Sequence, residues 1–354
     1  MEGTTVITNP TRQWQLRGSM PQRPTPRAAT TGAHHAQLAR RLTRRDRWLA
    51  RMLFEHKIFT TQQIVELCYP TMRAANHRLL DLYRWRVVDR FRPFVSRGTA
   101  PMHYVLDIAG AVALAQEDGL DPKSLDYRHE QAMGMAHSLR LAHTVGTNGI
   151  LTSLVARSQR PDARGRLTAW WSELRCARLF GDMVRPDAYG RWRDDDGDHV
   201  VEFFVEFDFG TEDLGKLSRK LIGYHKLSAA TGITTPVLVW LPTTRRETSA
   251  RAALATMLSH LDHPALVPVA TSAADLVDKD IQHDPAGPRW LPISCEQALP
   301  PQRLTLGELA RLWPYLTPPV PGQSALAGTA QPTAALLAAP DPLPPARPRD
   351  VFRR

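Results

Sequence analysis

Residues 184–224 contain the stretch that decides the fold: Val184-Arg-Pro-Asp-Ala-Tyr189, the acidic segment Asp194-Asp-Asp-Gly-Asp198, and Val201-Glu-Phe-Phe-Val-Glu-Phe-Asp-Phe-Gly-Thr-Glu212. The acidic, glycine-containing segment separates two apolar runs, which predicts a β-hairpin turn. In the second run acidic residues alternate with phenylalanine and valine, and successive side chains of a strand point to opposite faces. We therefore expect Glu206 and Asp208 on one face of a strand.

Three carboxylates would meet if the two strands of this hairpin are neighbours. Asp187 begins the first strand, and Glu206 and Asp208 lie towards the end of the second. Such an oxygen-rich set is what a hard divalent cation such as Mg²⁺ prefers, and the following helix carries Lys216 and Lys220, which would lean over the same place. The alternative is ordinary: acids on the solvent face of a half-buried strand, and lysines on a helix surface.

The flanking sequence extends this hairpin into an α/β domain with a mixed sheet. We expect strands at 235–242, 266–270 and 289–292, helices at 214–229, 247–260 and 271–279, and a short helical patch at 303–313. Alternation of strands with helices is typical of such a domain. Upstream, residues 129–155 predict a long helix or a broken pair. It carries His143, which is a weak candidate because a single histidine on a packed helix is more often a hydrogen-bonded core residue.

Residues 42–118 predict three helices followed by a β-hairpin, the order of a winged helix-turn-helix. Thr43 and Thr60 are N-cap residues, the third helix covers about 72–85, and strands are expected at 87–95 and 102–106. The third helix would read a DNA groove, and arginines with an asparagine suit phosphates and base edges. The alternative is a protein-contact module with solvated arginines. The candidate DNA-binding residues are Arg73, Asn76, His77, Arg78, Arg84, Arg90, Arg92 and Arg97, with Arg86 nearby.

Composition favours an anionic partner. The formal net charge of the 354-residue chain is +10, which indicates double-stranded DNA first. The three cysteines are far apart and read as reduced thiols of a cytoplasmic protein, and we expect no membrane span and no signal peptide. Residues 1–41 read as a disordered basic arm. Residues 299–354 read as a short helix followed by a disordered tail rich in proline and alanine.

The motifs together resemble the replication-relaxation family of actinobacterial and other Gram-positive plasmids and integrative mobile elements. The resemblance rests on Arg-Pro-Asp-Ala at 185–188, on Phe-Phe-Val-Glu-Phe-Asp-Phe-Gly-Thr-Glu at 203–212, and on the lysine-rich segment ending in Leu-Ile-Gly-Tyr at 221–224. It covers about residues 43–240, and the segment at 60–67 fits the family's N-terminal helix-turn-helix. It implies that residues 129–298 form a domain similar to the PD-(D/E)xK nucleases.

That resemblance also implies roles for individual residues. Asp187 matches the aspartate after proline, and Glu206 matches the second acid. The chain has Asp208 where the pattern has lysine, so Lys216 or Lys220 would supply the cation from the helix. Glu173 stands where the nuclease-like fold carries a helix acid; it would join the acidic cluster, or it would pair with Arg175 or Arg178.

We expect from these observations a DNA-binding accessory protein of plasmid or mobile-element replication or conjugative mobilisation, without robust catalysis. A relaxase or a replication initiator would be its protein partner. Two alternatives stay open: a Mg²⁺-dependent DNA endonuclease or nickase that uses Asp187 and Glu206, and a non-catalytic scaffold for protein interactions.

Overall fold

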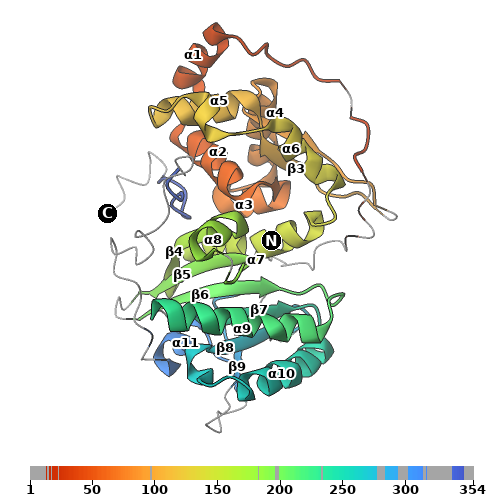
Figure 1. Cartoon of the computed structure of the whole chain (residues 1–354). Coiled ribbons are helices and arrows are strands. Elements are labelled where there is room, and N and C mark those ends of the chain that lie inside the picture. The colour runs from red at the N-terminus through yellow and green to blue at the C-terminus, as the bar shows by residue number, and fades with distance from the viewer. Residues whose placement is uncertain are drawn as a thin grey trace. The chain divides into compact units, whose positions relative to one another are not determined.

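The computed structural model describes residues 13, 16, 18–22, 24–95, 98–181, 183–195, 199–232, 234–276, 284–293, 302–313, 316 and 337–346 (Figure 1). The chain divides into two compact units. The N-terminal unit comprises residues 11–148 and 331–354, and the C-terminal unit comprises residues 149–330 with 1–10. None of the helices among the described residues is both long and apolar enough to cross a membrane.

The N-terminal unit contains the predicted three helices and hairpin. Its elements are α1 (Gly32–Arg41), α2 (Arg44–His56), β1 (Phe59–Thr60), α3 (Thr61–Cys68), α4 (Met72–Arg84), β2 (Val88–Phe91), β3 (His103–Leu106), α5 (Ile108–Glu117) and α6 (His129–Gly134). The capping threonines are confirmed, because Thr43 and Thr60 each form a reciprocal capping box with the side chain three residues later. The three strands form an antiparallel sheet in the order β1-β3-β2.

Apolar residues at helical spacing build the core of this unit. Leu49 and Leu53 on α2, Ile64 and Leu67 on α3, and Leu79 on α4 are buried almost completely. A second cluster joins Ile58, Phe91 and Val105 to Ala136 and Leu141, so residues 129–141 pack on the small sheet. Residues 129–155 are expected from the sequence to form one long helix or two shorter helices, and they form the second arrangement. Helix α6 and a 3₁₀ turn (Met135–His137) precede α7 (Leu141–Ser158).

The expectation of a disordered arm as far as residue 41 is wrong for residues 24–41. The backbone N–H of Ala28 donates to the carbonyl of Arg84 at 2.8 Å, and α1 buries Leu38 completely. The Arg27 guanidinium binds the buried carboxylates of Asp89 and Asp107 and lies over the Tyr83 ring. These partners lie more than fifty residues away in the sequence, so the local composition of the arm gives no sign of them.

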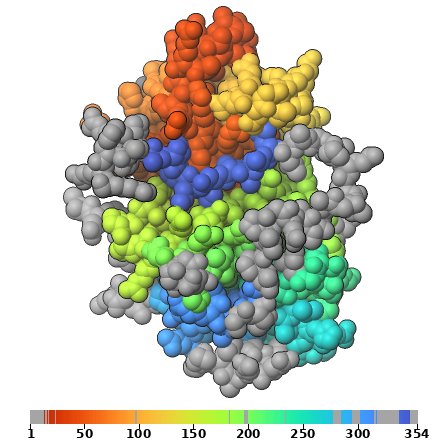
Figure 2. Space-filling model, turned by 90° about the vertical axis from the view of Figure 1, so that its left-hand side faces the viewer, coloured from red at the N-terminus to blue at the C-terminus, as the bar shows by residue number. Residues whose placement is uncertain are grey.

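A similar correction applies to part of the C-terminal tail. Residues 337–346 are placed against the N-terminal unit, where the indole N–H of Trp48 donates to the carbonyl of Asp341 at 2.7 Å and Leu337 is buried. Figure 2 shows this segment, in dark blue, lying below the red and orange N-terminal helices of the same unit. Asp341, whose carbonyl accepts the hydrogen bond, and the buried Leu337 lie in a proline-rich segment without apolar periodicity. The sequence pattern therefore does not reveal these contacts.

The C-terminal unit is a mixed six-stranded sheet with helices on both faces, as predicted for the fold class. The division between the units falls within α7. The following elements are β4 (Gly165–Ser172), α8 (Glu173–Phe180), β5 (Ala188–Asp194), β6 (Val200–Phe207), α9 (Leu214–Thr231), β7 (Val237–Leu241), α10 (Thr244–Ser259), β8 (Val269–Ala273), β9 (Leu291–Ile293) and α11 (Leu306–Leu312). The strand order is β4-β5-β6-β7-β8-β9.

The strand directions follow from the connections. β5 is antiparallel to both of its neighbours, β4 and β6, and the antiparallel pairing of β5 with β6 confirms the predicted hairpin, although residues 196–198 lie outside the described part of the chain. β6, β7 and β8 are parallel, because α9 and α10 cross over between them, and β9 returns antiparallel. The expectation of a helix at 271–279 is wrong for the part of this range that the structure describes, because residues 269–273 form β8.

Helices cover both faces of this sheet, so the alternative in which the acids lie on the solvent face of a half-buried strand does not hold for β6. Cys176 of α8, Leu221 of α9 and Leu254 of α10 share one apolar core with Phe204. On the other face, Phe203 packs against Gly190, where a Cβ would lie 2.6 Å from the ring, with α7 alongside. Seven of the eight β6 residues are buried as a result, and the acidic residues that alternate along the strand are buried with them.

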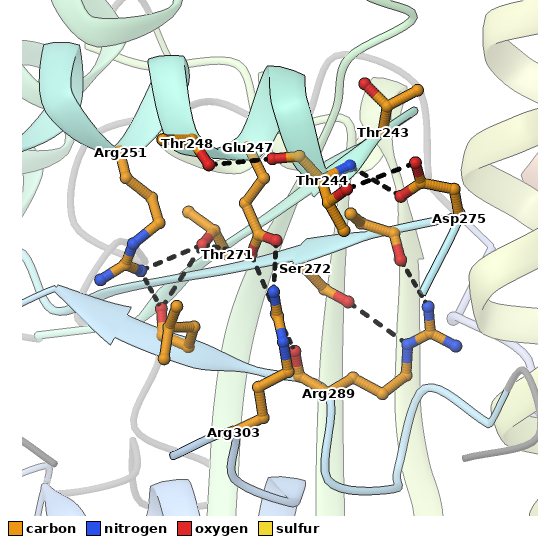
Figure 3. Close-up of polar contacts among 12 residues, drawn as sticks. Thr243, Thr244, Glu247, Thr248, Arg251, Thr271, Ser272, Asp275, Arg289 and Arg303 are labelled. Carbon is orange, nitrogen blue, oxygen red and sulfur yellow. Dashed lines mark hydrogen bonds and ion pairs between the residues drawn. The ribbon is translucent and has the colours of Figure 1, made fainter. Parts of the chain in front are cut away.

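A network of buried charges joins α10 to the far edge of the sheet (Figure 3). Glu247 of α10 accepts hydrogen bonds from the Arg303 guanidinium at 2.6 and 3.0 Å and from the Thr271 hydroxyl at 2.7 Å. Arg289 is completely buried over the Trp240 ring and donates to the carbonyl of Ala273 at 2.6 Å. Burial, together with the positive charge of Arg303, lowers the pKa of Arg289 to about 10.

We predict that Glu247→Gln destabilises the protein by about 3 kcal/mol. The substitution keeps the shape of the side chain but leaves the Arg303 guanidinium, whose side chain is 21% exposed, without its anion. Urea denaturation of the full chain measures the loss. The matched control is Glu212→Gln, whose partner Lys216 is 68% exposed, and which should cost less than about 1 kcal/mol. Equal losses for the two variants would contradict the prediction.

Candidate functional site

Glu206 lies at the centre of a group of ionisable side chains in the C-terminal unit. It is 2% exposed near the end of β6, where its Cα is opposite Val239 of the neighbouring parallel strand. Its carboxylate accepts a hydrogen bond from the Lys220 ammonium at 2.5 Å and another from the Tyr224 hydroxyl. Lys220 and Tyr224 are four residues apart on α9 and therefore lie on the same face of the helix, directed at one carboxylate.

Asp187 joins this group from the adjacent strand. Its backbone N–H donates to the carbonyl of Val205 at 3.1 Å, and its side-chain oxygen accepts from the backbone N–H of Phe207 at 2.8 Å. Asp187 immediately precedes β5, which pairs with β6 so that Ala188 is opposite Val205. The hairpin register therefore brings Asp187 beside Glu206, as predicted from the alternation of the strand. We call Asp187, Glu206, Lys220 and Tyr224 the acid cluster.

The electrostatics of the acid cluster follow from burial. Burial raises the pKa of Glu206 and the charge of Asp187 raises it further, while Lys220 and Tyr224 oppose the shift. Burial acts to lower the pKa of Lys220, but the two carboxylates outweigh it and the net direction is upward. Burial and the Glu206 carboxylate together raise the pKa of Tyr224. Lys220 is therefore firmly protonated, and Tyr224 acts as a hydrogen-bond donor.

The other predicted members of this site have different partners. Asp208 follows β6 and pairs with the Arg246 guanidinium of α10 at 2.7 Å, while its second oxygen accepts from the backbone N–H of Gly210 at 2.8 Å. Lys216 is exposed and pairs with Glu212 at 2.9 Å. Glu173 lies in the first turn of α8 and is partly exposed. Of the two candidate lysines, the structure thus brings Lys220 to Glu206.

One group of three potential metal ligands is found among the described residues, and it lies in the N-terminal unit. Ligand atoms of Asp89, Asp107 and His129 are within 4.8 Å of one another. Arg27 bonds to both carboxylates, and Arg86 lies 3.5 Å from Asp107. The hydrogen bond that the His129 imidazole donates to the Asp89 carboxylate raises the pKa of His129. Guanidinium groups supply the positive charge here, so this group holds the N-terminal segment in place and is a poor cation site.

The candidate DNA-binding residues divide into exposed and structural members. Arg73, Asn76, His77 and Arg84 are exposed on α4. Arg78 is half-buried and binds Asp46 with two nitrogens, at 3.0 and 2.5 Å. Arg90 lies over the Tyr83 ring at 4.3 Å, and Arg92 is half-buried. Arg97 lies outside the described residues. The exposed candidates on α4 are therefore the residues at positions 73, 76, 77 and 84, and Met72 at the start of the helix is exposed with them.

Three residues that the sequence did not single out hold these sites together. The spacing of four residues between Lys220 and Tyr224 is a usable signal for the role of the tyrosine. Arg246 neutralises Asp208, and Asp46 neutralises Arg78, but no local pattern indicates either pairing. His143 is half-buried in the first turn of α7. Asn148, further along α7, donates to the carbonyls of His56 and Ile58 at 3.2 and 2.8 Å, which is a structural contact.

The chain matches a known protein family. The model of the family described as replication-relaxation matches residues 51–239, more than half of the chain. This range begins within α2 and ends within β7, so it includes α4 and the whole acid cluster. Comparisons with curated proteins and with solved structures give no significant match.

We predict that Lys220→Met destabilises the protein increasingly as pH rises. The raised pKa of Glu206 means that the folded state binds this proton more tightly than the unfolded state does, so stability falls with pH from about 4.5 upward. Removing Lys220 raises that pKa further, and each additional pKa unit costs about 1.4 kcal/mol once both states are ionised. Denaturation at pH 5 and pH 8 measures the effect.

Lys216→Met on the same helix is the matched control. Lys216 is itself 68% exposed, so its ion pair with Glu212 is solvated and its loss costs less than about 1 kcal/mol at either pH. A loss for Lys220→Met that is the same at pH 5 and pH 8 would show that Glu206 does not depend on the lysine.

Proposed function

Since the chain belongs to the replication-relaxation family, we propose that it is a DNA-binding accessory protein that acts in the replication or the conjugative mobilisation of plasmids and other mobile elements. The N-terminal unit would bind double-stranded DNA, with α4 in the major groove. The C-terminal unit would contact DNA, a relaxase or a replication initiator.

The observation that carries the proposal is the exposed surface of α4. Arg73, Asn76 and His77 point away from the core on a helix whose opposite side is anchored by Leu79. The order α2-β1-α3-α4-β2-β3, with β3 between β1 and β2, is that of a winged helix, in which the last helix enters the groove. Asparagine suits adenine edges, and arginine suits guanine edges or phosphates. The formal net charge of +10 supports an anionic partner.

We predict that Asn76→Ala and Arg73→Ala weaken DNA binding in different ways. Asn76→Ala should cost about 1–3 kcal/mol and relax the preference at one base pair, because the amide reads a base edge. Arg73→Ala should weaken binding to all sequences and reduce the slope of log affinity against log salt by about 1, because it removes a phosphate contact. Fluorescence anisotropy at several salt concentrations, with a DNA library selected by the wild type, measures both.

Arg128→Ala is the control for loss of charge. Arg128 is 64% exposed outside α4 and pairs with Asp126 at 3.3 Å. If the wild-type protein does not bind DNA even at low salt, the proposal is wrong, and a scaffold for protein interactions is favoured instead.

The acid cluster favours a second candidate function, a metal-dependent DNA endonuclease. Asp187 and Glu206 converge from adjacent strands with the Lys220 ammonium beside them. Carboxylates suit Mg²⁺, so these two residues would hold the ion, although Lys220 and Tyr224 now bond to Glu206. Bound Mg²⁺ would supply positive charge at the phosphate and lower the pKa of a water molecule. Lys220 would stabilise the negative charge that develops on the phosphate.

We predict for this second function that Asp187→Asn and Glu206→Gln abolish the nicking of supercoiled plasmid DNA in the presence of Mg²⁺ or Mn²⁺. Both variants keep the shape of the side chain but lose the negative charge that a cation requires. DNA affinity should stay within a factor of about two, and Glu212→Gln, at a half-buried acid outside the acid cluster, should nick like the wild type. Wild-type protein that never nicks DNA with either ion would exclude the endonuclease while leaving DNA binding unaffected.

A further inference from the structure

Four arginines gather at the junction of α1 and α2. Arg40 and Arg41 end α1, Arg44 begins α2, and Arg45 follows it, with only Leu42 and Thr43 between the two pairs. Arg40, Arg41 and Arg44 are exposed, and Arg45 is half-buried. Within the described residues none of the four makes an ion pair. We call Arg40, Arg41, Arg44 and Arg45 the corner arginines.

The nearest acid does not neutralise the corner arginines. Asp46 is 1% exposed and is already fully engaged: it accepts from the backbone N–H of Thr43 at 2.7 Å and binds Arg78 with both oxygens. The next arginine along α2, Arg47, pairs with Glu117 at 3.0 Å. Positive charge that has no internal partner is therefore concentrated in residues 40–45.

The corner arginines lie along the flank of α4. Arg78, in the middle of α4, donates to the backbone carbonyl of Arg41 at 3.2 Å. The Arg41 guanidinium lies over the ring of Trp85, just after the end of α4, with 5.7 Å between the guanidinium carbon and the ring centroid. Arg45 lies 5.4 Å over the ring of Tyr69, which precedes α4. The corner arginines thus extend beside α4 from its C-terminal end to its N-terminal end.

Contacts of α1 fix the position of the corner arginines. The imidazole of His34 is hydrogen-bonded to the carbonyl of Trp85 at 2.8 Å, and Leu38 is completely buried. Figure 2 shows the red α1 at the surface of the molecule. The arginines are therefore held in a defined place beside α4, which lowers the entropy lost when they bind a ligand.

We propose that the corner arginines bind the sugar–phosphate backbone that borders the groove occupied by α4. This inference rests on the proposed DNA-binding function and adds a second contact surface to it. When a helix enters the major groove, a neighbouring helix crosses the adjacent backbone. A row of arginines along the flank of α4 matches a row of phosphates, which carry about one negative charge per 1.7 Å of duplex. These contacts fix position and add affinity without reading the sequence.

The test is the salt dependence of DNA binding by the double variant Arg40→Gln/Arg44→Gln in the full chain. Losing two phosphate contacts should reduce the slope of log affinity against log salt by about 1.8, since each contact contributes about 0.9. The ratio of affinities for selected and random DNA should stay unchanged. The conservative variant Arg40→Lys/Arg44→Lys should keep most of the slope, because it retains the charge.

The matched control is Lys123→Gln/Arg128→Gln, which removes two exposed positive charges of the same unit outside α1, α2 and α4. It should leave the slope within about 0.3 of the wild type. If Arg40→Gln/Arg44→Gln behaves like this control while the wild type binds DNA, the corner is not a DNA contact and the proposed function stands. If the wild type binds no DNA at low salt, both proposals fall. A changed sequence preference in the double variant would also overturn the inference, because it would indicate base contacts.

Discussion

A buried carboxylate needs a cation, and this requirement determines where five of the described basic side chains lie. In five ion pairs the acidic side chain is no more than 3% exposed. The pairs are Asp46 with Arg78, Asp107 with Arg27, Glu206 with Lys220, Asp208 with Arg246, and Glu247 with Arg303. Leaving such an acid unpaired would cost several kcal/mol. The pairs therefore set the docking of the N-terminal segment, of α9 and of α10.

The same requirement explains why two acids on one face of β6, and Asp208 directly after the strand, have three different environments. Glu202 is bound by Arg191 from the adjacent antiparallel strand, Glu206 by two side chains of α9, and Asp208 by Arg246 of α10. A solvent-facing row of acids would share one environment, whereas a row buried under successive elements receives a different partner from each. Glu206 is the member that also lies beside Asp187, so it is the one whose pKa is raised by a neighbouring carboxylate as well as by burial.

The sequence predicts those parts of the structure that depend on local pattern. The capping threonines, the β5–β6 hairpin and the convergence of Asp187 with Glu206 follow from turn residues and from the two-residue period of strands. It does not predict the long-range partners. Whether Lys216 or Lys220 reaches Glu206 depends on the rotation of α9 over the sheet, and the pairing of Arg27 with Asp89 and Asp107 spans 62 and 80 residues. The alternation of acidic and apolar residues at 202–208 is also compatible with a solvated face, because acids usually avoid the core.

The pairing of charges also separates the two candidate activities. Binding to DNA needs positive groups that are already exposed, and Arg73 on α4 with Arg40 and Arg44 at the corner meet that condition without rearrangement. Cleavage needs the Glu206 carboxylate to exchange hydrogen bonds from Lys220 and Tyr224 for a cation, inside a site that is 2% exposed. The first activity starts from the folded state as it stands, whereas the second has to overcome the interactions that keep a buried acid stable. The proposed DNA binding therefore requires less rearrangement of this structure than DNA cleavage would.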